Sequence, residues 1–159
     1  MIDNDGTMES PYARRRGGDS RRSDGDDVTD CLFCETDDPS LNGVLLDGQL
    51  FYVRWDNFPI AEGHVEIVPK RHVASYFDLT DEEAAEAYET IKKARELLDK
   101  KYQPDGYTIG VNEGRAAGRT IDHLHIHLIP RHEGDVPDPR GGVRGVLPGP
   151  HPDEWSSRT

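Results

Sequence analysis

Apolar and polar residues alternate over several short segments of the chain, and alternation with a period of two is typical of half-buried strands. Residues 44–53 predict two strands joined at an Asp-Gly turn, because this dipeptide adopts the positive backbone dihedrals that tight hairpins need. Further strands are expected over 64–69, 107–112 and 123–130. The pattern therefore predicts a five-stranded sheet.

One long helix is expected between the third and fourth strands. Thr80 and Glu83 have the spacing of a capping box, in which each side chain bonds the backbone N–H of the other residue. Apolar residues then recur at helical spacing as far as Leu98, and Lys100 and Lys101 suit the negative end of the helix dipole. This order of elements favours an α+β fold, with an antiparallel sheet packed against one main helix.

The two ends of the chain differ in composition from its centre. Residues 1–29 are rich in glycine, serine, aspartate and arginine and carry few apolar side chains, so we expect a disordered tail. Residues 136–159 are rich in proline and glycine and show no periodicity. A single folded domain is therefore expected over residues 30–135, followed by a C-terminal extension.

The charge of the chain narrows the classes of function. The 159 residues include 31 acidic and 19 basic side chains, which gives a net charge of −12. General binding to nucleic acid is disfavoured, because such proteins usually present a basic surface. No apolar run approaches the roughly 18 residues of a membrane-spanning helix, so we expect a cytoplasmic protein. The acidic, arginine-biased composition is typical of a halophilic cytoplasm, although an ordinary acidic cytosolic protein also fits.

Three histidines alternate with apolar residues near the end of the expected sheet. Successive side chains of a strand point to opposite faces, so His123, His125 and His127 would share one face at intervals of about 7 Å. Neutral imidazole is a good metal ligand and also serves as a nucleophile or proton shuttle near neutral pH. The alternative is a half-exposed strand that happens to use histidine as its polar residue.

A glycine-containing loop over residues 112–120 precedes these histidines. Glycine permits backbone conformations in which several N–H groups face one anion. A loop that holds phosphate beside a nucleophilic histidine predicts phosphoryl or nucleotidyl transfer.

The sequence HLHIHLI at 123–129 resembles the signature of the histidine triad (HIT) family of nucleotide hydrolases and transferases. The resemblance extends to CLFC at 31–34, PKRH at 69–72 and DPRGGVRG at 138–145. It implies a HIT-like α+β fold, with a five-stranded antiparallel sheet, one main helix and short helical segments. It also implies a homodimer.

The resemblance implies a mechanism as well. His125 would attack the α-phosphorus of a purine nucleotide derivative, such as a dinucleoside polyphosphate or a nucleoside phosphoramidate, and water would resolve the nucleotidyl-histidine. His127 would bond phosphate oxygens, and His64 would lie near the leaving group. Two alternatives use the same site: a nucleotidyltransferase or phosphorylase with another acceptor, and a nucleotide-binding regulatory protein with little turnover.

Further substrate contacts are implied by the same resemblance. Asp56 matches a position that holds the ribose hydroxyls, and Asn112 and Thr120 match polar residues around the phosphate. Gly118 and Arg119 belong to the same loop, where many relatives have glutamine in place of Arg119. Arginine at this position could clamp a phosphate or simply point to solvent. The base is expected in an apolar cleft, for which the candidates are Leu32, Phe33 and Phe58.

The cysteine pair Cys31 and Cys34 is compatible with a reduced pair, a disulfide or half of a metal site. The chain resembles the zinc-containing branch of the family at this pair. In that branch the ligands matching His72 and His123 complete a tetrahedral structural zinc site. Zinc bound to His123 would fix one end of the histidine strand and orient His125.

Overall fold

The computed structural model describes residues 31–36 and 42–147, so the expected tail at 1–29 and the end of the extension lie outside the described residues. The strands are β1 (Val44–Asp47), β2 (Phe51–Trp55), β3 (Val65–Pro69), β4 (Gly106–Gly110) and β5 (Ile126–Arg131). The main helix is α1 (Asp81–Tyr102), and short 3-10 helices occur at η2 (Tyr76–Asp78), η3 (Arg115–Ala117) and η4 (Gly142–Val146). None of the helices described has the length and apolar character needed to cross a membrane.

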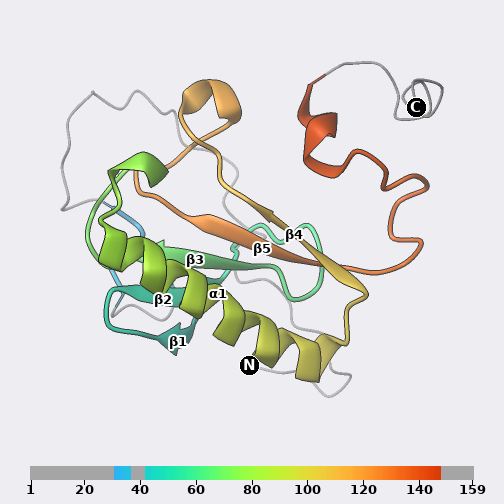
Figure 1. Cartoon of the computed structure of the whole chain (residues 1–159), viewed down its shortest axis with the longest axis horizontal. Coiled ribbons are helices and arrows are strands. Elements are labelled where there is room, and N and C mark those ends of the chain that lie inside the picture. Colours follow the sequence, from blue (N-terminus) through green and yellow to red (C-terminus); the bar gives the residue numbers. More distant parts are fainter. Residues whose placement is uncertain (1–30, 37–41, 148–159) are drawn as a thin grey trace, which may run out of the picture.

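The strands form one antiparallel sheet in the order β1-β2-β3-β5-β4, and α1 lies across one face of it (Figure 1). The α+β fold expected from the sequence is therefore confirmed. β3 occupies the centre of the sheet, and all five of its residues are buried. Its central position brings β2 and β5 to its two sides, although these strands are far apart in the sequence.

The capping box at the start of α1 is present as the sequence predicts. The Thr80 hydroxyl accepts a hydrogen bond from the Glu83 N–H at 3.2 Å, and the Glu83 carboxylate accepts one from the Thr80 N–H at 2.9 Å. The cap satisfies backbone donors that have no partner within the helix. It also fixes where α1 begins against the sheet.

We expect Thr80→Ala to lower the free energy of unfolding by about 1 kcal/mol, because the hydroxyl acceptor at the helix start is lost. Urea denaturation monitored by circular dichroism measures this change. Thr80→Ser keeps the hydroxyl and serves as the control, with stability close to that of the unchanged protein. Equal stability of the alanine and serine variants would contradict a role for the cap.

The two faces of the sheet are covered by different parts of the chain. Val65 and Ile67 belong to a core cluster with Ala94 and Leu98 of α1. Val68 points the other way and packs with a second cluster, which contains Cys31, Phe33 and Tyr52. The segment 31–36 thus covers part of the face opposite α1.

The structure differs from the expected strand limits at β4 and β5. β4 ends at Gly110, and the paired part of β5 begins at Ile126, so His123 and His125 precede it. The backbone N–H of Leu124 bonds the Val73 carbonyl at 2.6 Å instead of a neighbouring strand. The alternation nevertheless continues, because the three intervening apolar side chains are buried: Leu124, Ile126 and Leu128.

Candidate functional site

The histidines lie on the sheet face opposite α1, where three separate parts of the chain meet. His127 is the register partner of Glu66 in the centre of the sheet. His123 lies beside the end of β3, and its ring bonds the Pro69 carbonyl. Phe33, from the N-terminal segment, lies against the His125 ring at 5.0 Å between centroids.

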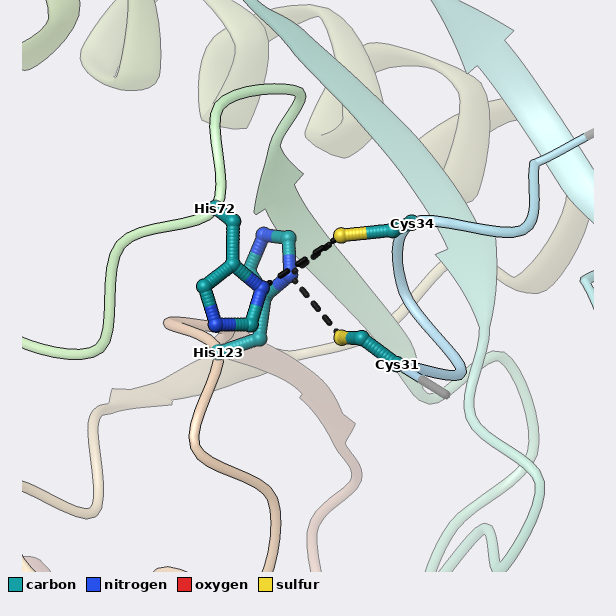
Figure 2. Close-up of side chains that lie close together, drawn as sticks. All are labelled: Cys31, Cys34, His72 and His123. Carbon is teal, nitrogen blue, oxygen red and sulfur yellow. Dashed lines mark hydrogen bonds between the residues drawn. The ribbon is translucent and has the colours of Figure 1, made fainter. Parts of the chain in front are cut away.

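Two thiols and two imidazoles converge at one end of this face (Figure 2). The Nδ1 atom of His123 lies 3.3 Å from Sγ of Cys31 and 3.5 Å from Sγ of Cys34. The Nδ1 atom of His72 lies 3.4 Å from Sγ of Cys34. All four donor atoms lie within 4.8 Å of one another. The cysteines are free thiols, so this arrangement is not a disulfide.

This donor set fits a tetrahedral zinc ion. Zinc bonds of about 2.3 Å to sulfur and 2.0–2.1 Å to nitrogen place neighbouring S and N ligands about 3.6 Å apart. The Nε2–H of His123 donates to the Pro69 carbonyl at 2.8 Å, which leaves the Nδ1 lone pair facing the thiols. Burial lowers the pKa of His123 to about 4, so its ring is neutral near pH 7. Burial and the neighbouring Cys31 raise the pKa of Cys34 to about 11, so metal binding would release its proton.

His125 presents one nitrogen with an available lone pair. Its Nδ1–H donates to the His123 backbone carbonyl at 2.9 Å, because a carbonyl oxygen can only accept. The proton of the neutral ring is therefore on Nδ1, and Nε2 carries the lone pair. Burial lowers the pKa of His125, which favours this neutral form. His123 thus joins the two sites: its ring belongs to the Cys/His cluster, and its carbonyl orients His125.

A second group of side chains surrounds His127. The His64 Nε2 atom lies 3.0 Å from Nδ1 of His127, and one oxygen of Asp56 lies 3.4 Å and 3.5 Å from these two nitrogens. Burial alone would raise the pKa of Asp56. Hydrogen bonds from His127 and the Phe58 N–H outweigh this effect and lower the pKa to about 2, below its usual value. Asp56 is therefore a carboxylate at neutral pH. Burial lowers the pKa of His64, although the charge of Asp56 opposes this shift.

The turn before β3 places His64 in this group. Gly63 has a φ of +81°, and a Cβ atom there would come within 2.8 Å of the Tyr102 ring and 3.1 Å of Pro130. Any other residue would be strained and would clash with these side chains. The Ile60 N–H donates to Nδ1 of His64 at 3.4 Å, which favours a proton on Nε2.

Arg54 and Glu66, which no sequence motif indicates, form an ion pair beside the histidines. Arg54 Nη1 lies 3.1 Å from Glu66 Oε2, and both side chains are almost fully buried. The guanidinium also lies over the Phe33 ring, 5.0 Å from its centroid. The signal available in the sequence was one charged residue within each of two otherwise uncharged strands, FYVRW and VEIVP.

The loop residues expected around the phosphate do not join the histidine group in this structure. Asn112, Gly118 and Thr120 are exposed, and among the contacts described none links them to the histidines. Arg119 donates to the Ala74 carbonyl at 2.8 Å and pairs with Asp122 at 3.2 Å. The Arg119 guanidinium therefore links the loop to the neighbouring segment at Ala74. A role for this loop in binding phosphate stays a prediction.

The three residues expected to line the cleft for the base differ in how far they are buried. Phe33 is buried, and its ring lies against the His125 ring. Phe58 is 79% exposed. Leu32 is partly buried beside the cluster that contains Phe33. Among the ring contacts described, those of Phe33 reach two triad histidines, His123 and His125.

Comparison with known proteins gives a consistent family match. The model of the HIT domain matches residues 41–134. An uncharacterized HIT-like protein of Methanocaldococcus jannaschii is 36% identical over 110 residues, which cover 66% of this chain and 81% of that protein. An AP-4-A phosphorylase of Mycobacterium tuberculosis is 38% identical over 94 residues, covering 58% of this chain and 48% of the phosphorylase. The chain spans about half or less of the length of several curated relatives that it matches.

Solved structures show the same fold. A HIT family member from Bacillus subtilis aligns with a TM-score of 0.63 at 25% identity, over 79% of this chain and 85% of that one. A Zn-bound histidine triad family protein from Mycobacterium smegmatis aligns with a TM-score of 0.60 at 25% identity, over 82% and 98% of the two chains.

Proposed function

This chain belongs to the HIT domain family, and on that premise we propose that it is a nucleotide hydrolase acting through a nucleotidyl-histidine on His125. The substrate class is a purine nucleotide derivative, such as a dinucleoside polyphosphate or a nucleoside phosphoramidate, cleaved at the α-phosphate. His127 and His64 carry the proton that the leaving group needs. The Asp56 carboxylate binds the ribose hydroxyls or orients these two histidines.

The geometry of His125 is the observation that carries this proposal. Its Nδ1–H bond to the His123 carbonyl and its burial favour a neutral ring with the lone pair on Nε2. A neutral imidazole held in one orientation is a competent nucleophile toward phosphorus. His127 lies beside it, with the two ring centroids 5.0 Å apart.

In the first half-reaction, Nε2 of His125 forms a bond to the α-phosphorus, and the bond from phosphorus to the leaving group breaks. The leaving atom needs a proton. His64 and His127 share one hydrogen bond beside the Asp56 carboxylate, so this pair can hold one additional proton. That proton passes to the leaving group as the bond breaks, and the pair returns to its neutral state.

In the second half-reaction, water attacks the phosphorus of the nucleotidyl-histidine and the P–N bond breaks. The electron pair of that bond returns to Nε2 of His125. The water proton passes to the neutral His64–His127 pair, which restores the protonated state of the first step. The products are a nucleoside monophosphate and the free leaving group.

Phosphorolysis is a second candidate, supported by the match to an AP-4-A phosphorylase. Inorganic phosphate would then attack the nucleotidyl-histidine in place of water, and the product would be a nucleoside diphosphate. The first half-reaction is the same in both cases, because the two activities differ only in the acceptor that reaches the intermediate.

We also propose a structural zinc ion held by the Cys/His cluster, as in the zinc-containing branch of the family. The supporting observations are the converging donor atoms and the orientation of His123 by Pro69. Bound zinc would link four ligands from three segments and hold them in a tetrahedral shell: Cys31, Cys34, His72 and His123. The His123 carbonyl, which orients His125, would thereby be held in place.

The proposed function is tested by incubating the protein with diadenosine tetraphosphate and, separately, with adenosine 5′-phosphoramidate. Each reaction is run with and without inorganic phosphate, and the products are separated by chromatography. Hydrolysis predicts AMP in every reaction, whereas phosphorolysis predicts ADP when phosphate is present. Tight binding of both compounds with no product would contradict an enzyme and support the regulatory alternative.

A further inference from the structure

The ion pair of Arg54 and Glu66 occupies the centre of the histidine face. The side chains are 1% and 7% exposed, and their charged atoms lie 3.1 Å apart. The sheet register pairs Arg54 with Glu66 and Glu66 with His127 across β2, β3 and β5. A buried ion pair is often no more stabilising than an apolar pair of similar size, because both charges lose their hydration. Fold stability alone therefore does not account for this pair.

The Glu66 carboxyl group lies next to two of the three histidines of the proposed reaction, His125 and His127. One of its oxygens and one ring nitrogen from each of His125 and His127 lie within 4.8 Å of one another. Burial raises the pKa of Glu66 to about 7, and the charge of Asp56 adds to this shift, while Arg54 and His127 oppose it. Small changes in the local charge therefore change the protonation of Glu66 near neutral pH.

Both positively and negatively charged groups surround the Glu66 carboxyl group. Arg54 lies on the neighbouring strand β2, with Asp56 just after that strand. His127 and His125 approach from β5 and the residue before it. His64 contacts Asp56 and His127 at the edge of the group. α1 covers the other face of the sheet.

We propose that Glu66 takes up a proton from solvent when an anionic nucleotide binds to the histidine face. The inference rests on the proposed function, which brings a phosphate to His125 and His127. A phosphate there adds negative charge near a buried carboxylate, and like charges at short distance favour the protonated acid. Protonation of Glu66 removes this repulsion and raises the charge of the Arg54–Glu66 pair by one unit next to the phosphate. The pair thus changes from neutral to net positive as the anion arrives.

Isothermal titration calorimetry of AMP binding at pH 7.5 tests this inference. Titrations in two buffers of different ionisation enthalpy give the number of protons taken up per nucleotide bound. At this pH the AMP phosphate has largely lost its second proton and contributes equally for every variant. The variant Glu66→Gln keeps the shape of the side chain but cannot take up a proton.

Glu83→Gln is the matched control, because Glu83 is also 7% exposed and paired with an arginine, at 2.7 Å from Arg71, but belongs to the start of α1. We expect the unchanged protein and Glu83→Gln to take up about half a proton more per AMP than Glu66→Gln, as a carboxyl of pKa near 7 is mostly ionised at pH 7.5. The dissociation constant of the unchanged protein should also rise about tenfold between pH 7 and 9, and more steeply than that of Glu66→Gln.

Equal proton uptake by the unchanged protein and Glu66→Gln, with AMP bound to both, would overturn the inference. Failure of the unchanged protein to bind AMP would instead contradict the proposed function, and the inference with it. If Glu66→Gln does not fold, infrared difference spectroscopy of the unchanged protein decides the question. A protonated carboxyl band that appears on AMP binding supports the inference, and its absence overturns it.

Discussion

The variant His125→Asn is expected to lose turnover of diadenosine tetraphosphate and adenosine phosphoramidate by about 10⁴-fold or more, as enzymes do when the nucleophile is removed. Asparagine is similar in polarity and can still bond the His123 carbonyl, but its amide nitrogen has no lone pair available for phosphorus. The substrate contacts made by other residues are kept. We therefore expect kcat to fall while the binding of AMP changes little.

His132→Asn is the matched control for this substitution. His132 follows β5, its side chain is about half exposed, and its ring lies 3.8 Å from Asp105, away from the triad. Turnover by this variant should stay within about twofold of the unchanged protein, as expected for a surface substitution. Steady-state assays of both variants make the comparison. Turnover by His125→Asn above about a tenth of the original rate would contradict a nucleophilic His125.

Removal of the proposed zinc is expected to have the second large effect. The double variant Cys31→Ser/Cys34→Ser should contain no zinc and should lose at least about 3 kcal/mol of unfolding free energy, because metal binding to structural sites contributes directly to folding. Turnover should fall as well, since His123 would no longer be held in the orientation that fixes His125. Elemental analysis and urea denaturation measure the first two quantities.

Chelation and readdition of zinc provide the control for the double variant. Removing the metal from the unchanged protein should reproduce the loss of stability, and one equivalent of zinc per chain should restore it. Arg115→Ser changes an exposed residue outside the cluster and should leave the zinc content unchanged. Purified, undenatured protein without near-stoichiometric zinc, or a double variant of unchanged stability, would contradict the zinc proposal.

The local elements of the fold could be predicted because their signals lie close together in the sequence. The capping box of Thr80 and Glu83 depends on residues three positions apart, and it is present in the structure. The alternation at 123–128 correctly predicted that Leu124, Ile126 and Leu128 are buried. The predicted start of this strand at His123 was wrong. Strand pairing depends on the partner strand, and β3 pairs with β5 only from Ile126 onward.

The site depends on contacts between residues that are distant in the sequence, so periodicity could not assemble it. The Cys31–His123 contact joins residues 92 positions apart, and the family resemblance, not the spacing, suggested it. The pairing of Arg54 with Glu66 follows from the register of β2 and β3, which no local pattern specifies. Arg54 or Glu66 alone looks like an ordinary charged residue in a strand. A role in the site is indicated only by the register that places both residues in one row with His127.

Nucleophilic catalysis by His125 is tested most directly by trapping the intermediate on this residue. The protein is mixed with diadenosine tetraphosphate, quenched in alkali during turnover and analysed by peptide mass spectrometry, since phosphorus–histidine bonds survive base and break in acid. We expect an adenylyl group on His125 that acid removes. Active turnover with an adenylyl group on a different side chain, or with none on the protein at any time point, would contradict it.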